Sequence, residues 1–166
     1  KSFSSGGIKT LLFDKFCNQF NSTVNSYLST VSGGLMSIVI RPTKVLKSGE
    51  ERNKIGIDVL FNGTVVKFES LSGGEKKRVD VSLCLALNKW ISERYNIENG
   101  LLGIIVLDEL CCFIDDSGTE AIASLLLDES QNKAIYIIDH DLDLKSYVSN
   151  VLTVLKVDGV SLINRE

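Results

Sequence analysis

The chain has 166 residues, a formal net charge of −3, 44% hydrophobic residues and a single proline. This length suits one domain, or one lobe of a larger one, with a substantial core. The weak charge excludes a global basic field of the kind that indicates nucleic-acid binding. No run approaches the roughly 18 apolar residues of a membrane-spanning helix, and a signal-peptide pattern is absent, so we expect a soluble, cytoplasmic protein.

The four cysteines are expected to be reduced thiols. Cys17, Cys84, Cys111 and Cys112 form no C-x-x-C pair, and two adjacent cysteines are poorly placed to bind one zinc ion together. Cys84 lies in an apolar helical run, where it is most simply a small buried residue. This usage is typical of a cytosolic protein.

The first third of the chain predicts one long helix followed by strands. Residues 1–7 are rich in Ser and Gly and are interpreted as a linker or a cut end. Residues 8–31 predict an amphipathic helix, which Gly33-Gly34 ends. Its apolar stripe comprises Phe13, Phe16, Phe20, Val24, Leu28 and Val31.

Strands are predicted at residues 35–40, 55–61 and 64–68, with the tight-turn signal Asn62-Gly63 between the last two. The polar segment 42–52 is predicted to be a mobile loop. Residues 41–54 also hold five cations against two glutamates. A solvated hairpin surface is favoured there over a phosphate-binding role.

The rest of the chain alternates helices and strands. A helix is predicted from the Ser-Gly-Gly turn to about residue 95, with its inward face formed by Val79, Leu83, Leu87 and Trp90 or Ile91. Residues 101–107 predict a strand buried on both faces of a parallel sheet. A helix (117–128), a strand (134–138), a short helix (141–149) and a hairpin around Asp158-Gly159 follow. We therefore predict an α/β fold, with its chemistry at the carboxyl ends of parallel strands.

Three pieces of sequence point to nucleotide hydrolysis. The turn Ser72-Gly73-Gly74 opens a helix, so its N–H groups suit a phosphate. The apolar run 103–107 leads into Asp108 and Glu109, where one carboxylate can hold Mg²⁺ and the other can orient water. His140 directly follows another apolar strand and an aspartate. The blander alternatives are a helix-capping Asp108, a solvated Glu109 and a structural histidine.

In this order, the motifs resemble those of ABC-type ATPases. Residues 71–75 resemble the signature, 104–109 the Walker B strand, Ile114-Asp115 with Gly118 the D-loop, and His140 the switch histidine. The Glu-Lys-Lys-Arg that follows the two glycines resembles the SMC-like DNA-repair branch. That branch includes the SbcC-type large subunit of double-strand-break exonucleases and its phage versions. The resemblance covers nearly the whole chain and implies a single domain (1–166), the C-terminal lobe of an ATPase head with a mixed sheet and flanking helices.

The resemblance also implies roles for individual residues. Asp108 would hold Mg²⁺, Glu109 would polarise the attacking water, and His140 would contact the γ-phosphate or that water. The signature residues that would bind a nucleotide held mainly by a second molecule are Ser72, Gly73, Gly74 and Glu75.

Two further motifs leave alternatives open. Asp115 would cross a dimer interface, but an N-cap or turn aspartate is equally favoured. Lys76, Lys77 and Arg78 lie in the first turn of the predicted helix, an unfavourable place for cations. They indicate either a partner, such as DNA, or exposed solubilising charges.

One motif of the family is missing. No G-x-x-x-x-G-K-[ST] phosphate loop occurs in these residues. In the family it lies in an N-terminal lobe that a coiled coil separates from this one. The chain therefore resembles half of a head, and we expect it alone to bind ATP weakly and not to hydrolyse it.

The resemblance implies an ATPase subunit, with ATP and Mg²⁺, of a DNA recombination and repair exonuclease. The implied partners are the Walker A lobe, a second head in a homodimer, a nuclease subunit and double-stranded DNA ends, with no membrane. The main alternative is a chromosome-organising SMC-type ATPase without a nuclease. A transporter nucleotide-binding domain is less favoured, because a hairpin rather than a helical segment precedes the signature. A non-catalytic docking module is disfavoured by the intact Asp108, Glu109 and His140.

Overall fold

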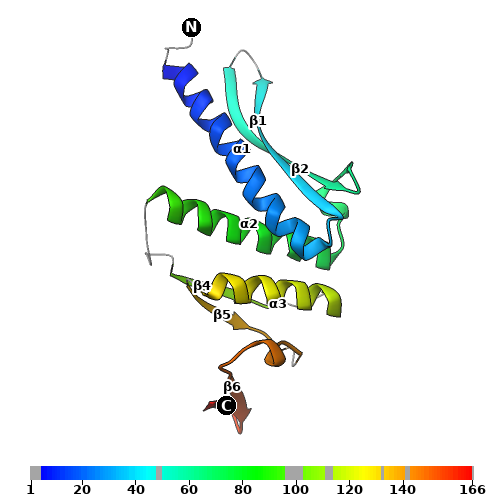
Figure 1. Cartoon of the computed structure of the whole chain (residues 1–166), viewed down its shortest axis with the longest axis vertical. Helices are drawn as coiled ribbons and strands as arrows, with labels where there is room; N and C mark the ends of the chain where they lie inside the picture. The colour runs from blue at the N-terminus through cyan, green and yellow to red at the C-terminus, as the bar shows by residue number, and fades with distance from the viewer. Residues whose placement is uncertain are drawn as a thin grey trace.

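The computed structural model describes residues 5–47, 50–95, 103–110, 114–131, 133–140 and 143–165. The described residues form three helices and three sheets, and the three helices follow one another from top to bottom in Figure 1. The helices are α1 (Ser5–Ser32), α2 (Gly73–Arg94) and α3 (Asp116–Ser130), with short 3₁₀ turns η1 (Phe68–Ser70) and η2 (Asp143–Tyr147). Among these residues, no helix has the length and apolarity needed to cross a membrane.

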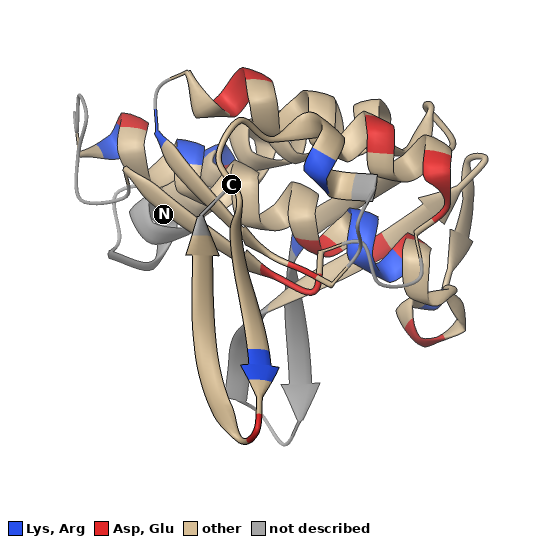
Figure 2. Ribbon diagram, turned by 90° about the horizontal axis from the view of Figure 1, so that it is seen from below, with Lys and Arg blue, Asp and Glu red and all other residues tan. Residues whose placement is uncertain are grey.

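The strands confirm the α/β class, with both antiparallel and parallel pairing. Strands β1 (Met36–Lys47), β2 (Glu50–Phe61) and β3 (Thr64–Val66) form an antiparallel sheet. Strands β4 (Ile104–Asp108) and β5 (Ala134–Ile138) form a parallel pair. Strands β6 (Leu152–Val157) and β7 (Val160–Arg165) form a separate hairpin, which projects away from the helices (Figure 2). The predicted two-residue turns are confirmed at residues 62–63 and 158–159, where all four residues have positive φ.

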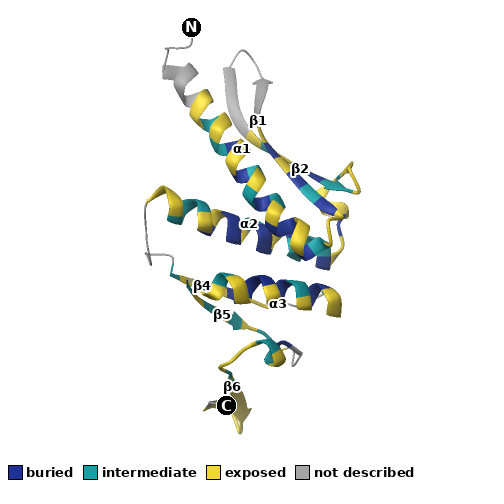
Figure 3. Ribbon diagram, viewed as in Figure 1, coloured by how far each residue is buried: buried dark blue, intermediate teal, exposed yellow. Residues whose placement is uncertain are grey.

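The core lies where α1 packs against α2, α3 and β1 (Figure 3). The predicted stripe of α1 is confirmed: Phe20, Val24, Leu28 and Val31 are buried, while Phe13 and Phe16 are partly buried. The ring of Phe16 stacks on Phe20 and meets Trp90 of α2 edge-on, at centroid distances of 5.3 and 4.9 Å. Helix α1 begins at Ser5, so residues 5–7 of the predicted linker are helical, whereas residues 1–4 lie outside the described part.

The predicted loop at 42–52 is wrong, because β1 and β2 remain paired up to Lys47 and Glu50. Polar composition does not prevent a strand whose backbone groups are satisfied by its neighbour. Residues 48 and 49 lie outside the described ranges. Of the predicted helix 141–149, residues 141 and 142 lie outside the described ranges, and the rest is observed only as η2. The predicted strand 64–68 ends at Val66.

Three predictions of burial are also wrong. Leu87 is 46% exposed and Cys84 is exposed, because α2 turns Val79, Ser82 and Leu85 toward the core instead. In β4, Ile105 and Leu107 are buried, but Ile104 and Val106 on the opposite face are exposed. The described part of the chain supplies α3 for one face of this pair and no layer for the other.

Two asparagines on α1 complete the hydrogen bonding of the sheet edge at β1. The amide of Asn25 accepts from the N–H of Ile38 (2.7 Å) and donates to its carbonyl (2.8 Å). Asn21 makes the same pair of bonds with Ile40, both at 2.8 Å. Four residues of helix rise about 6 Å and two residues of strand about 6.6 Å, so the spacings match. These side chains occupy the place of a further strand and protect the edge.

We predict that Asn25→Leu weakens this edge locally. The substitution leaves the N–H and carbonyl of Ile38 without partners, which costs about 2 kcal/mol, or roughly thirtyfold faster amide exchange at Ile38. Hydrogen–deuterium exchange measures this rate. The control is Thr30→Ala, because the Thr30 hydroxyl donates only within its own helix, to the carbonyl of Ser26. Equal exchange rates in the two variants would contradict the prediction.

A partly buried polar network joins the three helices. Glu129 of α3 accepts from the Tyr27 hydroxyl of α1 (2.7 Å) and from the Lys133 ammonium (2.7 Å). Lys133 also donates to Asn88 of α2 (3.1 Å). Burial on its own would raise the pKa of Glu129, but the bonds from Lys133 and Tyr27 hold that pKa below the ordinary 4.5.

This lowered pKa predicts a stability that depends on pH. A carboxylate with a lowered folded-state pKa stabilises the fold above its unfolded pKa, and this stability is lost as the pH falls through the folded pKa. We expect Glu129→Gln to lower the free energy of unfolding by about 1–2 kcal/mol near neutral pH. The difference from wild type should shrink as the pH falls through the folded-state pKa of Glu129, below which both side chains are neutral. Denaturant unfolding over a series of pH values from neutral to acid measures this difference, and a difference independent of pH would show that the charge of Glu129 is not its cause.

Candidate functional site

The parallel pairing of β4 and β5 brings three predicted site residues to one edge. Asp108 is the register partner of Ile138. The two strands therefore end together, with Glu109 following one and Asp139-His140 following the other. Carboxyl ends of parallel strands are where α/β folds place their chemistry. The predicted grouping of Asp108, Glu109 and His140 at one edge agrees with this backbone placement, while their chemical roles stay predictions.

The peptide between Asp108 and Glu109 is held from two sides. Its carbonyl accepts from the ammonium of Lys77 in α2 (3.3 Å). Its N–H donates to the carbonyl of Ile138 at the end of β5 (2.8 Å). Glu109 adopts a left-handed backbone with φ of 49°. This conformation is unfavourable for a non-glycine residue, and such strain concentrates at functional sites.

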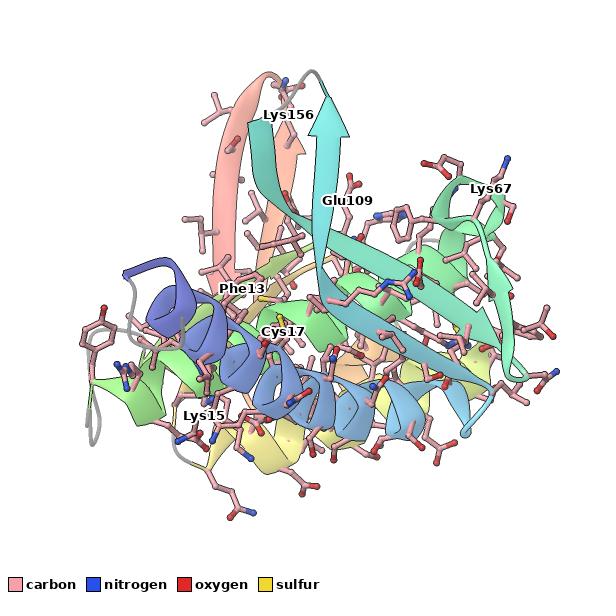
Figure 4. All side chains as sticks on the ribbon, turned by 90° about the horizontal axis from the view of Figure 1, so that it is seen from above. Phe13, Lys15, Cys17, Lys67, Glu109 and Lys156 are labelled. Carbon is pink, nitrogen blue, oxygen red and sulfur yellow. The ribbon has the colours of Figure 1, made fainter. Side chains whose placement is uncertain are left out.

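The side chains at this edge differ in exposure. Asp108 and Glu109 are exposed, and Figure 4 shows Glu109 on the side of the helices from which the β-hairpins project. The imidazole of His140 is 80% exposed, whereas the neighbouring Asp139 carboxylate is only 4% exposed and lies 3.8 Å from Nδ1. An accessible imidazole and two accessible carboxylates can meet a ligand that approaches this edge.

The edge of β4 and β5 offers an accessible carboxylate at Asp108. Within the described ranges, no group of three or more His, Cys, Asp or Glu side chains is arranged to hold a metal. Mg²⁺ commonly takes one or two carboxylates and completes its octahedron with phosphate oxygens and water. The exposed carboxylate of Asp108 fits that limited role.

The signature residues form a helix N-terminus with a complete capping box. The Ser72 hydroxyl accepts from the N–H of Glu75 (3.3 Å), and the Ser72 N–H donates to the Glu75 carboxylate (2.7 Å). Ser72 and Gly73 are exposed, whereas Gly74 is buried. Glu75 thus has a structural task at the start of α2. Its nucleotide contact, like those of the other three residues, stays a prediction.

The three cations after the signature have partners within this lobe. The Lys76 ammonium donates to the carbonyl of Glu69 (3.1 Å), and Lys77 donates to Asp108 as described. Arg78 is only 14% exposed. Its Nε donates to the carbonyl of Val31 (2.9 Å), and its Nη2 donates to Asp115 (2.7 Å). For Arg78, the interpretation as an exposed solubilising charge is wrong.

Asp115 caps α3, as one of the two sequence interpretations predicts. Its Oδ1 accepts from the N–H of Gly118 (2.8 Å) and from the hydroxyl of Ser117 (3.3 Å). The Gly118 N–H, with the charge of Arg78, lowers the pKa of Asp115. A role across a dimer interface stays a prediction, and residues 111–113 lie outside the described part.

The sequence did not predict three features of the structure: the two contacts of Arg78, the hydrogen bond from Lys77 to Asp108, and the hydrogen bonds of Asn21 and Asn25 with β1. The available signal was the run of three cations near a helix N-terminus, which is an unfavourable place for positive charge. The structure places Arg78 in the second turn of α2 rather than in the predicted first turn.

The fold is shared with heads of SMC proteins. An Smc head domain with an extended coiled coil, derived from Pyrococcus furiosus, superposes with a TM-score of 0.72 at 19% identity, over 95% of this chain and 37% of that one. No family model matches the chain. The chain therefore has the fold of part of an SMC head domain.

In sequence, the chain is similar to a DNA-repair ATPase and to a probable exonuclease subunit. It is 25% identical over 114 residues to a DNA double-strand break repair Rad50 ATPase of Thermococcus kodakarensis, covering 68% of this chain and 12% of that protein. It is 24% identical over 121 residues to a probable exonuclease subunit 2 of Escherichia phage T5, covering 73% of this chain and 18% of that protein. The chain thus spans less than a fifth of the length of either relative.

The strained backbone of Glu109 predicts a conflict between stability and function. Because glycine adopts positive φ without steric cost, Glu109→Gly should raise the free energy of unfolding by about 1 kcal/mol. Denaturant unfolding measures this change. Asn62→Gly is the matched control, because Asn62 has φ of 48° in a hairpin turn, and asparagine tolerates this region better. A destabilised Glu109→Gly variant would show that contacts of the glutamate side chain outweigh the strain.

Proposed function

We propose that the complete protein is the ATP-hydrolysing, SMC-like subunit of a DNA recombination and repair exonuclease. It would be a cytoplasmic, DNA-associated protein in which two heads close around ATP and control nuclease access to double-stranded DNA ends. The observation that carries this proposal is the edge of β4 and β5, where Asp108, Glu109 and His140 follow strands that end in register. The names of the two relatives support the link to repair and to a nuclease.

Each residue has a task in this proposal. Asp108 shares in holding Mg²⁺, which neutralises the developing charge on the phosphates. Glu109 orients the attacking water, and the exposed imidazole of His140 contacts the γ-phosphate or that water. Positioning supplies most of the catalysis in phosphoryl transfer. The rigid peptide between Asp108 and Glu109 fits that requirement, because it is hydrogen-bonded at both of its polar atoms.

The proposed site is composite. Ser72, Gly73, Gly74 and Glu75 form a helix N-terminus whose positive end would close over a nucleotide bound to a second head. ATP would bridge the closed dimer and stabilise it over the open one through these differential contacts. Asp115 would then couple the two sites across the interface, and hydrolysis would release the heads.

We propose that the N-terminal Walker A lobe of the same protein packs on the exposed face of strands β4 and β5. Ile104 and Val106 of β4 are 61% and 58% exposed, and Tyr136 and Ile138 of β5 are 56% and 57% exposed. Parallel strands are normally covered on both faces, and contiguous apolar surface marks an interaction site. The relatives are at least five times longer than the matched segment, which leaves room for such a lobe.

A chromosome-organising SMC-type ATPase without a nuclease is the second candidate. The likeness to an Smc head supports it. The likeness to a probable exonuclease subunit favours the repair function instead. Co-purification of a nuclease with the complete protein would separate the two candidates.

We predict that the complete protein hydrolyses ATP, that linear double-stranded DNA stimulates turnover, and that Ser72→Arg and Glu109→Gln each abolish it. Ser72→Arg should act by blocking head closure, and Glu109→Gln by removing the group that orients water. Steady-state turnover with and without DNA is the measurement. A wild-type rate that ignores DNA and survives Ser72→Arg would sink the composite repair-ATPase proposal.

This lobe by itself is expected to bind ATP weakly and not to turn it over, because its sequence has no phosphate loop. Titration of the purified 166-residue chain with ATP, followed by a phosphate-release assay, checks both statements. Steady hydrolysis that Glu109→Gln removes would contradict this expectation.

A further inference from the structure

Arg78 lies at a junction of three helices. It projects from the second turn of α2, its Nε donates to the carbonyl of Val31 near the end of α1 (2.9 Å), and its Nη2 donates to Asp115 at the start of α3 (2.7 Å). The side chain is 14% exposed. One guanidinium therefore joins segments that are 47 and 37 residues away in the sequence.

The charges at this junction favour an arginine. The carbonyl of Val31 belongs to the last turn of α1, where carbonyls lack intrahelical partners and the helix end is negative. Asp115 supplies a carboxylate that also caps α3. A planar guanidinium donates in two fixed directions at once. A lysine ammonium carries the same charge but does not donate in two fixed directions from one plane.

The space at Gly118 beside the junction is tightly filled. A Cβ atom added at Gly118 would overlap Nη2 of Arg78 and would come within 2.6 Å of Ile114 Cγ2 and 2.7 Å of Asp115 Oδ1. A side chain at this position would therefore displace the guanidinium or the carboxylate. Among the described residues, Asp115 is hydrogen-bonded by both α3 and α2.

We propose that Arg78 is a positioning residue for ATP turnover: it holds Asp115 and the start of α3 in a fixed relation to the last turn of α1. A movement of α1 is thereby transmitted to the residue that faces the second head. Arg78 acts through Asp115 and touches neither nucleotide nor metal. The inference rests on the proposed ATPase function, and it adds a residue and a route that the signature and the Walker B strand do not contain.

The test uses the complete protein and a double-mutant cycle. Arg78→Met removes both hydrogen bonds, while Asp115→Asn keeps an oxygen for the Gly118 N–H but loses the ion pair. Arg94→Met is the matched control, because it removes an exposed arginine in the last turn of the same helix. Initial rates at varied ATP give kcat and KM for each variant.

Arg78→Met and Asp115→Asn should each lower kcat about tenfold, with KM for ATP within about twofold of wild type. The double variant should be no slower than the slower single variant, since both substitutions break one contact. Arg78→Lys should recover only part of the rate. Arg94→Met should match wild type.

Three results would overturn the proposal: an Arg78→Met variant that turns over like Arg94→Met, a double variant slowed by the product of the single effects, or complete rescue by Arg78→Lys. If Arg78→Met does not fold, wild-type kcat in Asp115→Asn would still refute the positioning role, because this variant retains the cap but loses the ion pair. Wild-type turnover that does not depend on Glu109 would instead overturn the proposed function, and this inference with it.

Discussion

The parallel pairing of β4 and β5 is the constraint on which the candidate site depends. Because Asp108 and Ile138 are register partners, the segments that leave both strands emerge at one edge. The hydrogen bond from the Glu109 N–H to the Ile138 carbonyl extends this pairing by one step. It ties the left-handed backbone of Glu109 to the strand that leads to His140. Two carboxylates and an imidazole thus share one accessible edge.

The buried polar groups of the described residues are hydrogen-bonded within the chain, whereas several large apolar side chains are exposed. The start of α2 is closed by a capping box, the start of α3 by Asp115, and the edge of β1 by two asparagines. No buried side-chain nitrogen or oxygen of the described residues lacks a hydrogen-bond partner. In contrast, one face of β4 and β5 and much of the β6–β7 hairpin expose large apolar side chains. An uncovered sheet face beside these polar junctions is consistent with the proposed docking of a further lobe.

Much of the local structure could be predicted from the sequence. The three- and four-residue spacing of apolar side chains located α1, and Asn62-Gly63 and Asp158-Gly159 located two tight turns, because these signals depend on residues close in the chain. The Ser72-Gly73-Gly74 turn located the start of α2 for the same reason. The failures at Leu87, Cys84, Ile104 and the segment 42–52 have one cause. Burial and strand length depend on which neighbouring layer is present, and no local pattern specifies that.

The sequence by itself determined the order of elements, the turn chemistry and the residues that resemble an ATPase site, all of which are set by neighbours within a few positions. Only the tertiary structure decided which groups form hydrogen bonds and ion pairs with the polar side chains. Arg78 is unfavourable in its own helix but lies within reach of a helix end and a carboxylate 47 and 37 residues away. Asn21 and Asn25 are ordinary helix-surface residues until a strand edge comes alongside them. Charge and hydrogen-bond geometry act over a few ångströms in space, so these pairings exist only once the helices and strands have packed together.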